Sequence, residues 1–159
     1  MTDAEFAARL GAARDRDAVY AALHARSQVV TPVRLWTVMD VDMEAGVARR
    51  AYTSHPGAYP VSGTKPVPQN DWFDRIATAH EPFVANDIAA IAAVFPDHET
   101  IAALGCASVV NLPVVLAGRL AATVNLLDAA GAFPVAVVDR LREALALPAV
   151  AAVGIARTL

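Results

Sequence analysis

The chain has 159 residues, of which 56 % are hydrophobic and 18 % charged, and its formal net charge is −3. This length suits one domain, which we place over residues 1–159. No stretch reaches the roughly 18–20 uncharged apolar residues of a membrane helix, so we expect no membrane association. Basic residues are scattered, with only Arg49 and Arg50 adjacent, so we expect no nucleic-acid partner.

The cellular location is inferred from the N-terminus and from cysteine usage. The opening sequence MTDAEFAARL lacks the basic segment and apolar block of a signal peptide. The chain has one cysteine, Cys106, and therefore no internal disulfide, whereas secreted proteins often use paired cysteines. We predict a cytoplasmic protein.

The first third of the chain predicts a helix followed by a β-hairpin. Within residues 3–26, apolar side chains recur near a 3.6-residue period, which predicts one N-terminal helix. Residues 33–41 and 47–54 are rich in residues that favour strands. Turn-forming residues at 42–46 join them.

Residues 55–70, HPGAYPVSGTKPVPQN, contain four prolines and two glycines. This composition excludes a helix and leaves few backbone donors for a sheet. Long ordered loops of this kind often present side chains to ligands. A proline-stiffened connector explains the segment equally well, and both interpretations stay open.

Short elements are predicted between residues 70 and 105. Residues 82–86 indicate a strand, and three short helices each follow a residue type that caps helices. These helices begin after Asn70 or Asp71 and run from Trp72 to about His80, after Asp87 and before Pro96, and after Asp97 up to Gly105.

Residues 107–127 predict a second hairpin, in which two apolar runs flank Ala117 and Gly118. Each run carries one asparagine, Asn111 or Asn125, and a buried amide is costly unless it is hydrogen-bonded. If the two turn residues are central, Asn111 faces residue 124, and the two amides are diagonal neighbours. A slip of one residue would place both on one face. The amides are therefore either satisfied core groups or the floor of a pocket.

The last predicted helix spans residues 133–159 and begins at Phe133 and Pro134, since proline is tolerated in a first turn. Its apolar residues alternate by three and four, a pattern typical of helices that pack on a sheet, on another helix or on a second subunit. We expect Pro148 to kink or split it near residue 147.

Catalytic and metal-binding signals are weak. No lysine, arginine or histidine lies within five residues of Cys106, so it is expected to be an inert buried thiol. The four histidines lack the spacing of metal ligands, and no nucleophile or phosphate-loop motif is present. We therefore predict no catalytic residue, metal or cofactor. The candidate ligand-binding residues, which combine apolar bodies with polar ends or place amides in apolar strands, are Tyr52, Ser54, Tyr59, Lys65, Trp72, Asn111 and Asn125.

Several segments resemble the GAF domain family: the SVVNLPV run at 108–114 with its VNLL return, FVAND at 83–87 and the FP-initiated helix at 133. The segments YTSHPGAYPVSGTKP and FPDHETIAALGC resemble a bacterial subgroup of stand-alone GAF domains. The resemblance implies an α+β, PAS-related fold with an antiparallel sheet. Helices 1–26 and 133–159 would cover one face, and residues 33–128 would supply the sheet and the short helices and loops over a pocket on the other face.

GAF domains typically bind small molecules and regulate an output domain. The resemblance therefore implies a signal-transduction module that senses an unknown small molecule, as a homodimer through its terminal helices. The cyclic-nucleotide signature NKxxFDE is missing, and Cys106 enters a core strand without an adjacent histidine, which disfavours a chromophore anchor. A single thiol disfavours a methionine sulfoxide reductase, since the GAF-fold reductases use several cysteines. The alternatives are a small-metabolite enzyme, which would need His55, His98 or Cys106 in the pocket, and a protein-interaction module.

Overall fold

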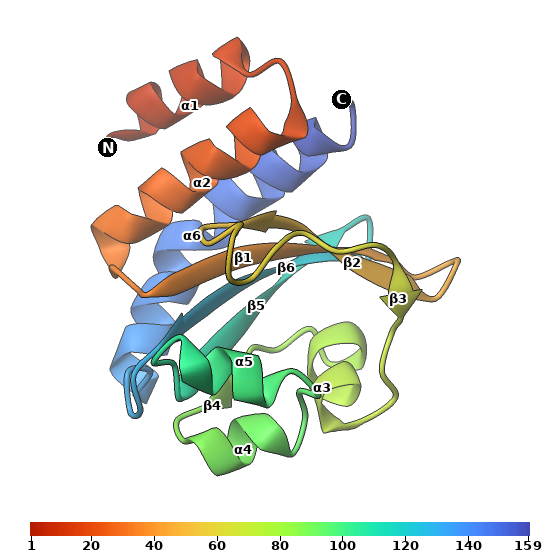
Figure 1. The fold of residues 1–159 in the computed structure, drawn as a ribbon. Coiled ribbons are helices and arrows are strands. Elements are labelled where there is room, and N and C mark those ends of the chain that lie inside the picture. Colours follow the sequence, from red (N-terminus) through yellow and green to blue (C-terminus); the bar gives the residue numbers. More distant parts are fainter.

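A six-stranded antiparallel sheet, in the order β3-β2-β1-β6-β5-β4, forms the centre of the computed structural model, which describes residues 1–159 (Figure 1). The strands are β1 (Leu35–Asp42), β2 (Val47–Thr53), β3 (Lys65–Pro66), β4 (Phe83–Ala85), β5 (Ser108–Leu116) and β6 (Arg119–Asp128). The helices are α1 (Asp3–Ala12), α2 (Arg16–Val30), α3 (Asp71–Phe73), the π-helical η1 (Asp74–Thr78), α4 (Ile88–Ala92), α5 (His98–Ala103) and α6 (Val135–Ala156).

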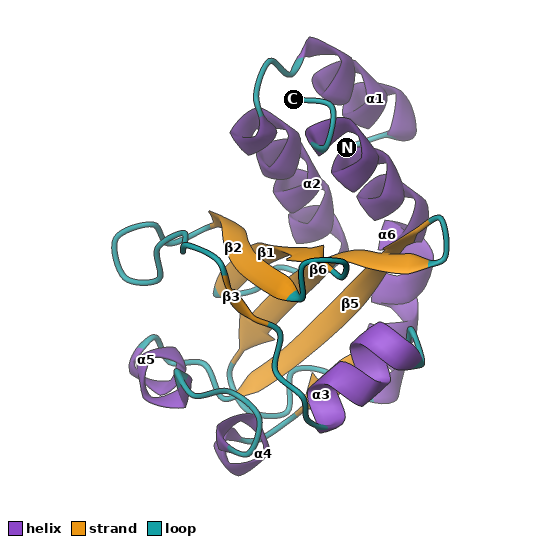
Figure 2. Cartoon of the chain, turned by 90° about the vertical axis from the view of Figure 1, so that its right-hand side faces the viewer, coloured by secondary structure: helices purple, strands orange, loops and turns teal.

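The helices form one layer on each side of the sheet, as the predicted α+β class requires. Helices α1, α2 and α6 lie on one side, and α3, α4 and α5 lie on the other (Figures 1 and 2). The largest core cluster lies beneath the terminal helices and includes Trp36, Val124 and Leu141. Within it the indole Nε1–H of Trp36 donates to Ser27 Oγ at 3.0 Å. The short helices pack over the opposite face, which leaves that side of the sheet less completely filled.

The prediction of one helix over residues 3–26 is wrong, because the chain forms two helices there. Helix α1 ends at Ala12, and Ala13 is extended with ψ 139°. Asp15 then begins a new helix, since its carboxylate accepts a hydrogen bond from the backbone N–H of Ala18 at 2.8 Å. A capping aspartate is more stable at a helix start than in a helix interior, which favours the break.

Pro148 lies inside α6, which runs unbroken from Val135 to Ala156, so the predicted split near residue 147 is wrong. A proline in a helix interior removes the hydrogen bond to the carbonyl four residues before it. The neighbouring residues Leu145 and Ala149 are both buried in the main core. Packing of this face on the sheet and α2 outweighs the loss of one backbone hydrogen bond.

The predicted hairpin of β1 and β2 and the predicted strand β4 are confirmed. Asn70 caps α3 through a hydrogen bond from the Phe73 backbone N–H, and Asp87 caps α4 in the same way through Ala90. In the proline-rich segment only Lys65 and Pro66 form a strand, paired with the edge of β2. The rest of the segment is irregular and passes over the face that carries the short helices.

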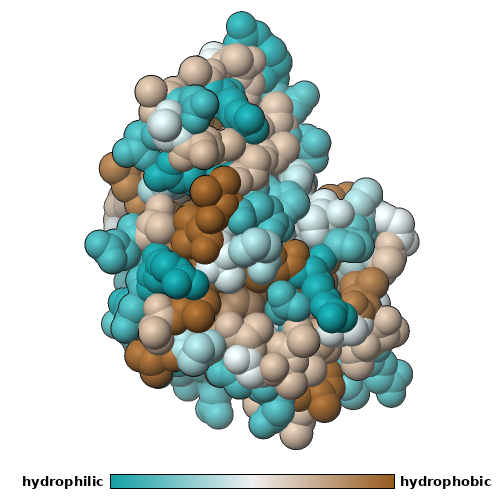
Figure 3. All heavy atoms as spheres, turned by 90° about the vertical axis from the view of Figure 1, so that its left-hand side faces the viewer, coloured by the Kyte–Doolittle hydropathy of each residue, from teal (hydrophilic) through white to brown (hydrophobic).

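None of the helices combines the length and the apolar character that crossing a bilayer requires. On the face drawn in Figure 3, hydrophobic residues form small separate patches among hydrophilic ones. Among the most exposed large apolar side chains, Val29 lies on α2, and Val135 and Leu147 lie on α6.

Candidate functional site

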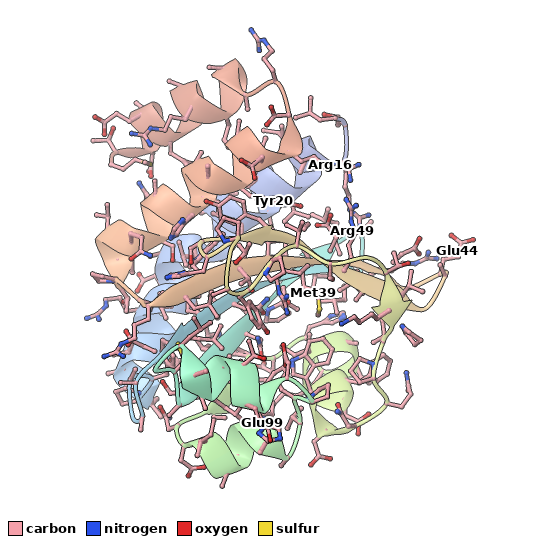
Figure 4. The ribbon with its side chains drawn as sticks, in the orientation of Figure 1. Arg16, Tyr20, Met39, Glu44, Arg49 and Glu99 are labelled. Atoms are coloured by element: carbon pink, nitrogen blue, oxygen red, sulfur yellow. The ribbon has the colours of Figure 1, made fainter.

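A cavity of about 270 Å³ lies between the sheet and the short helices. Five strands line it, and Met39 of β1 points from the sheet toward the short helices in Figure 4. Tyr20, in contrast, lies between α2 and the opposite face of the sheet. The side of the cavity away from the sheet is formed by Trp72 of α3, Ile101 of α5 and residues of the proline-rich loop. The cavity is therefore closed by the segments with the least regular structure.

The asparagines of the second hairpin meet on the floor of this cavity. At the tip of the hairpin, Leu116 pairs with Arg119, as the predicted turn requires. A bulge then leaves Ala121 unpaired, which shifts the register by one residue, and Asn111 pairs with Asn125 instead of with residue 124. The predicted diagonal arrangement is therefore wrong, and the alternative of one register slip describes the strands.

Four buried polar groups form a continuous hydrogen-bonded chain across the floor. The indole Nε1–H of Trp72 donates to Asn111 Oδ1 at 3.1 Å, and Asn111 Nδ2 donates to Asn125 Oδ1 at 2.6 Å. Asn125 Nδ2 then donates to Thr37 Oγ1 at 3.1 Å. The chain joins α3 to three adjacent strands, because its members lie on α3, β5, β6 and β1. We call these four residues the amide chain.

A second bulge, at Ala51 of β2, follows Arg50, which faces the cavity. Val38 pairs with Tyr52, whereas Met39 pairs with Arg50, so Ala51 has no partner across the ladder. Met39 and Arg50 therefore share the cavity face, and both line the cavity. If the register from the hairpin turn continued without the bulge, Tyr52 would lie on this face as well.

Arg50 connects the proline-rich loop to the start of α5. Its guanidinium lies 3.5 Å from the centre of the Tyr59 ring, and its Nη2 lies 3.3 Å from the Asp97 carboxylate. Tyr59 donates its hydroxyl hydrogen to the same carboxylate oxygen, and Arg50 Nη1 donates to the Pro60 carbonyl at 2.8 Å. Burial, followed by the charge of Asp97, raises the pKa of Tyr59 well above its usual value. We call Arg50, Tyr59 and Asp97 the loop latch.

Comparison with solved structures identifies the architecture. The GAF domain of a phosphoenolpyruvate-protein phosphotransferase from Coxiella burnetii covers 98 % of this chain and 90 % of its own, with a TM-score of 0.70 and 12 % identity. The GAF domain of a two-component sensor histidine kinase from Bacillus halodurans covers 88 % of this chain and 94 % of its own, with a TM-score of 0.69 and 8 % identity. A GAF domain/HD domain protein from Geobacter sulfurreducens covers 91 % of this chain and 95 % of its own, with a TM-score of 0.68 and 12 % identity. The chain has the GAF domain fold.

The GAF fold is visible here in the structure and not in sequence similarity. The sequence matches no family model, and it is similar to no curated protein at a significant level. The three structures share 8–12 % of their residues with this chain. The fold is therefore shared, while the chemistry of the cavity has to be argued from the residues of this chain.

Five of the seven candidate ligand-binding residues line the cavity of this GAF fold: Tyr59, Lys65, Trp72, Asn111 and Asn125. The prediction that Tyr52 shares a sheet face with the asparagines is wrong, because Tyr52 packs with His24 and Trp36 under the terminal helices. Ser54 also lies outside the cavity, where its Oγ accepts from the Trp36 backbone N–H at 2.9 Å. Both residues follow the bulge at Ala51, which breaks the alternation that the sequence suggests.

Sequence reasoning missed five polar residues that line the cavity: Thr37, Arg49, Arg50, Ser62 and Asp97. Asp97 was expected to cap α5, but its side chain makes no capping hydrogen bond. Its carboxylate instead interacts with Tyr59 and Arg50. No sequence signal separates these two roles, because the same aspartate before a helix suits either one. Thr37 could have been found from its position in an apolar strand.

The three residues named for the enzyme alternative lie outside the cavity. His55, His98 and Cys106 do not line the cavity. Cys106 is 1 % exposed, and burial is the main cause that raises the pKa of its thiol, which disfavours the nucleophilic thiolate. No group of three or more histidine, cysteine, aspartate or glutamate side chains is arranged to hold a metal ion.

Proposed function

We propose that this protein is a sensory signal-transduction module, acting in the cytoplasm, that binds a small molecule in the cavity. The amide chain carries this proposal, because it places polar side chains on the floor of a cavity whose other walls are largely apolar. Small-molecule sites generally combine apolar walls with a few fixed polar groups. Solved structures with this fold include parts of a sensor histidine kinase and of a methyl-accepting chemotaxis protein, which supports a sensory role.

The proposed site consists of residues from both walls of the cavity. Asn111 and Asn125 would orient the ligand from the sheet, and Trp72 would cover its apolar part. Tyr59 and Lys65 would contact it from the proline-rich loop. Because Tyr52 and Ser54 face other surroundings, they take no part in the proposed site.

Signal transmission would use the loop latch. The latch holds the loop against the start of α5 through one aromatic ring, one ion pair and two hydrogen bonds. A ligand that contacts Tyr59 or Arg50 binds the latched and unlatched arrangements with different affinity, and it therefore shifts their populations. The surface of the loop and of α5 then differs between the free and the bound protein.

A thermal-shift screen against a metabolite library, followed by isothermal titration calorimetry, tests the binding. We expect at least one ligand to raise Tm. The variant Val109→Phe, which adds a ring to a residue that lines the cavity, should abolish this shift while keeping the circular dichroism spectrum. Val29→Phe makes the same change at an exposed position of α2 and should bind normally. If no compound raises Tm, or if Val109→Phe responds like the wild type, the proposal is wrong.

We also propose that α6 contributes to a homodimer, as the sequence pattern suggests. Leu141 of this helix is fully buried in the core, whereas Leu147 is 76 % exposed and Val150 is partly exposed. Light scattering tests the proposal with Leu147→Glu, which leaves the core intact, and with Val29→Glu as the control on α2. A dimeric mass that falls to the monomer only for Leu147→Glu supports it, and an unchanged mass contradicts it.

A further inference from the structure

The direction of the amide chain is set by its first member. An indole N–H can only donate, so Asn111 must present its carbonyl oxygen to Trp72. The amide nitrogen of Asn111 consequently points to Asn125, which must accept with its own carbonyl oxygen. The amide nitrogen of Asn125 then donates to the hydroxyl of Thr37. Each amide has one allowed orientation, and no flip is compatible with its neighbours.

This direction leaves donors without acceptors. Each amide nitrogen carries two hydrogens and makes one hydrogen bond with the protein, and the Thr37 hydroxyl accepts without donating to another side chain. Asn111 and Asn125 are only 4 % and 8 % exposed. Buried N–H groups without a partner are rarer than carbonyl oxygens with one unused lone pair. The floor of the cavity therefore calls for a group that accepts several hydrogen bonds.

The charges around the cavity are mainly positive. Arg49, Arg50 and Lys65 line it, against one lining carboxylate, that of Asp97, and Arg49 is paired with Asp40 at 3.6 Å. Asp97 is already engaged by Tyr59 and Arg50, whereas Lys65 forms no ion pair within 4.0 Å and Arg50 keeps its Nε–H free of a protein acceptor. An anion in the cavity would meet cationic side chains that are only partly neutralised.

The remaining walls are apolar and the space is small. Trp72, Phe95, Ile101, Val109 and Leu127 line it together with prolines. The volume of about 270 Å³ lies just below the ~300–1,000 Å³ range typical of ligand pockets. This combination suits an apolar body that carries one polar end.

We propose that the cavity binds a small organic acid, whose carboxylate accepts hydrogen bonds from Asn111, Asn125 and Thr37 while Arg50 and Lys65 balance its charge. The inference rests on the proposed function and narrows it to one class of ligand. A carboxylate fits better than a phosphate ester, because the floor offers neutral donors and Arg50, the guanidinium on the cavity face, already contacts Asp97 and Pro60.

Two sets of probes of matched shape test the class of ligand. One set shares a phenyl body: benzoate, benzyl alcohol, benzylamine and phenyl phosphate. The other pairs 3-methylbutanoate with 3-methylbutan-1-ol. We expect only the carboxylates to raise Tm and to shift the side-chain amide NMR signals of Asn111 and Asn125. The inference is overturned if a neutral, cationic or phosphate probe binds as well as its carboxylate, or if no carboxylate binds at millimolar concentration.

A substitution that keeps the amide chain sharpens the test. Asn125→Asp preserves the acceptor for Asn111, and Thr37 can donate to the second carboxylate oxygen, but the spare N–H is lost and a negative charge is added. We expect carboxylate affinity to fall roughly tenfold to hundredfold. Asn70→Asp, a helix cap outside the cavity, should bind like the wild type. Equal binding by Asn125→Asp overturns the inference.

A variant at the exposed Lys65 protects the test against misfolding. Lys65→Gln removes one charge from the rim and leaves the core untouched. Carboxylate affinity should fall by about two- to fivefold, and the loss should shrink as salt is added. An unchanged affinity at low salt contradicts the inference. A library ligand without a carboxylate would overturn this inference and keep the proposed function, whereas a library without any ligand would overturn the proposed function itself.

Discussion

Asn111 and Asn125 lie directly opposite each other in neighbouring strands and share a hydrogen bond of 2.6 Å, because one unpaired residue, Ala121, separates them from the turn. If Ala121 were paired, Asn125 would pair with Val110, which belongs to the core under the terminal helices. A single bulge therefore decides whether the second amide faces the core or the cavity. The polar floor of the cavity depends on strand register as much as on residue type.

The amide chain predicts a large loss of stability when its centre is removed. Asn111→Leu leaves the indole N–H of Trp72 and the carbonyl oxygen of Asn125 without partners, at a cost of about 1–3 kcal/mol for each group. Urea unfolding monitored by circular dichroism measures the loss. Adding Trp72→Phe removes the orphaned N–H, so the double variant should lose less stability than the sum of the two single variants. Additive losses would contradict a coupled chain.

Two buried threonines of the sheet should respond in opposite directions to the same substitution. Thr123 is fully buried, and its hydroxyl has no hydrogen-bond partner. Thr123→Val should therefore raise the free energy of unfolding by about 1 kcal/mol. Thr37→Val should lower it by about 1–3 kcal/mol, because the amide of Asn125 loses its acceptor. Urea unfolding of both variants measures the difference, and changes of the same sign would contradict the hydrogen bonds described here.

The three tyrosines predict how stability depends on alkaline pH. Burial is the main cause that raises the pKa of Tyr20, Tyr52 and Tyr59 above the ordinary value of 10.0, and a neighbouring aspartate adds to the effect for each. Above about pH 10 the unfolded chain loses these protons while the native protein keeps them. Stability contributed by the buried phenols is therefore complete below pH 10 and falls as pH rises further.

Phenolate absorbance and urea unfolding between neutral pH and about pH 11 check this dependence. We expect each tyrosine to be less ionised in the native protein at pH 10 than in urea, where all three should be about half-ionised. Tyr59→Phe should reduce the decline of stability with pH, because one fewer phenol loses its proton in the unfolded chain while keeping it in the native protein. A native tyrosine that titrates at its ordinary pKa would contradict the burial described for it.

Much of the sheet could be predicted from local sequence signals. The turn at Ala117 and Gly118 and the pairing of Leu116 with Arg119 depend on turn residues next to apolar runs, and these are visible in the sequence. The bulges at Ala51 and Ala121 are not visible, because an alanine in a strand carries no signal for being unpaired. The positions of these bulges depend on how the whole sheet packs, and a local sequence pattern carries no information about that packing.

The same limit explains which site residues were found. Tyr59 and Trp72 were identified because aromatic residues with polar ends suit pockets on any backbone. Strict alternation predicts Tyr52 on the cavity face, and the bulge at Ala51 turns it to the opposite face. Asp97 was assigned to a helix cap, since its partners Tyr59 and Arg50 are 38 and 47 residues away in sequence. Long-range partners of this kind become visible only in the folded protein.

The hairpin turn itself predicts a stabilising substitution. Ala117 has φ 50° and Gly118 has φ 79°, and positive φ at both central residues is the geometry of a type I′ turn. Glycine adopts this region freely, whereas alanine is strained there and asparagine tolerates it better. Ala117→Asn should therefore raise the free energy of unfolding by about 0.5–1 kcal/mol. Gly118→Ala should lower it by about 1 kcal/mol for the same reason.

The matched control for this turn is Ala130→Asn, because Ala130 is also exposed in a turn but does not have positive φ. Its effect should stay within about 0.5 kcal/mol. Urea unfolding of the three variants measures the differences, and an equal effect of asparagine at both positions would show that the strain at Ala117 does not limit stability. The turn and the bulge at Ala121 both lie between Asn111 and Asn125 along the hairpin. If Ala117→Asn also strengthens the side-chain amide NMR signals of these two asparagines, the turn and the bulge fix the strand register together.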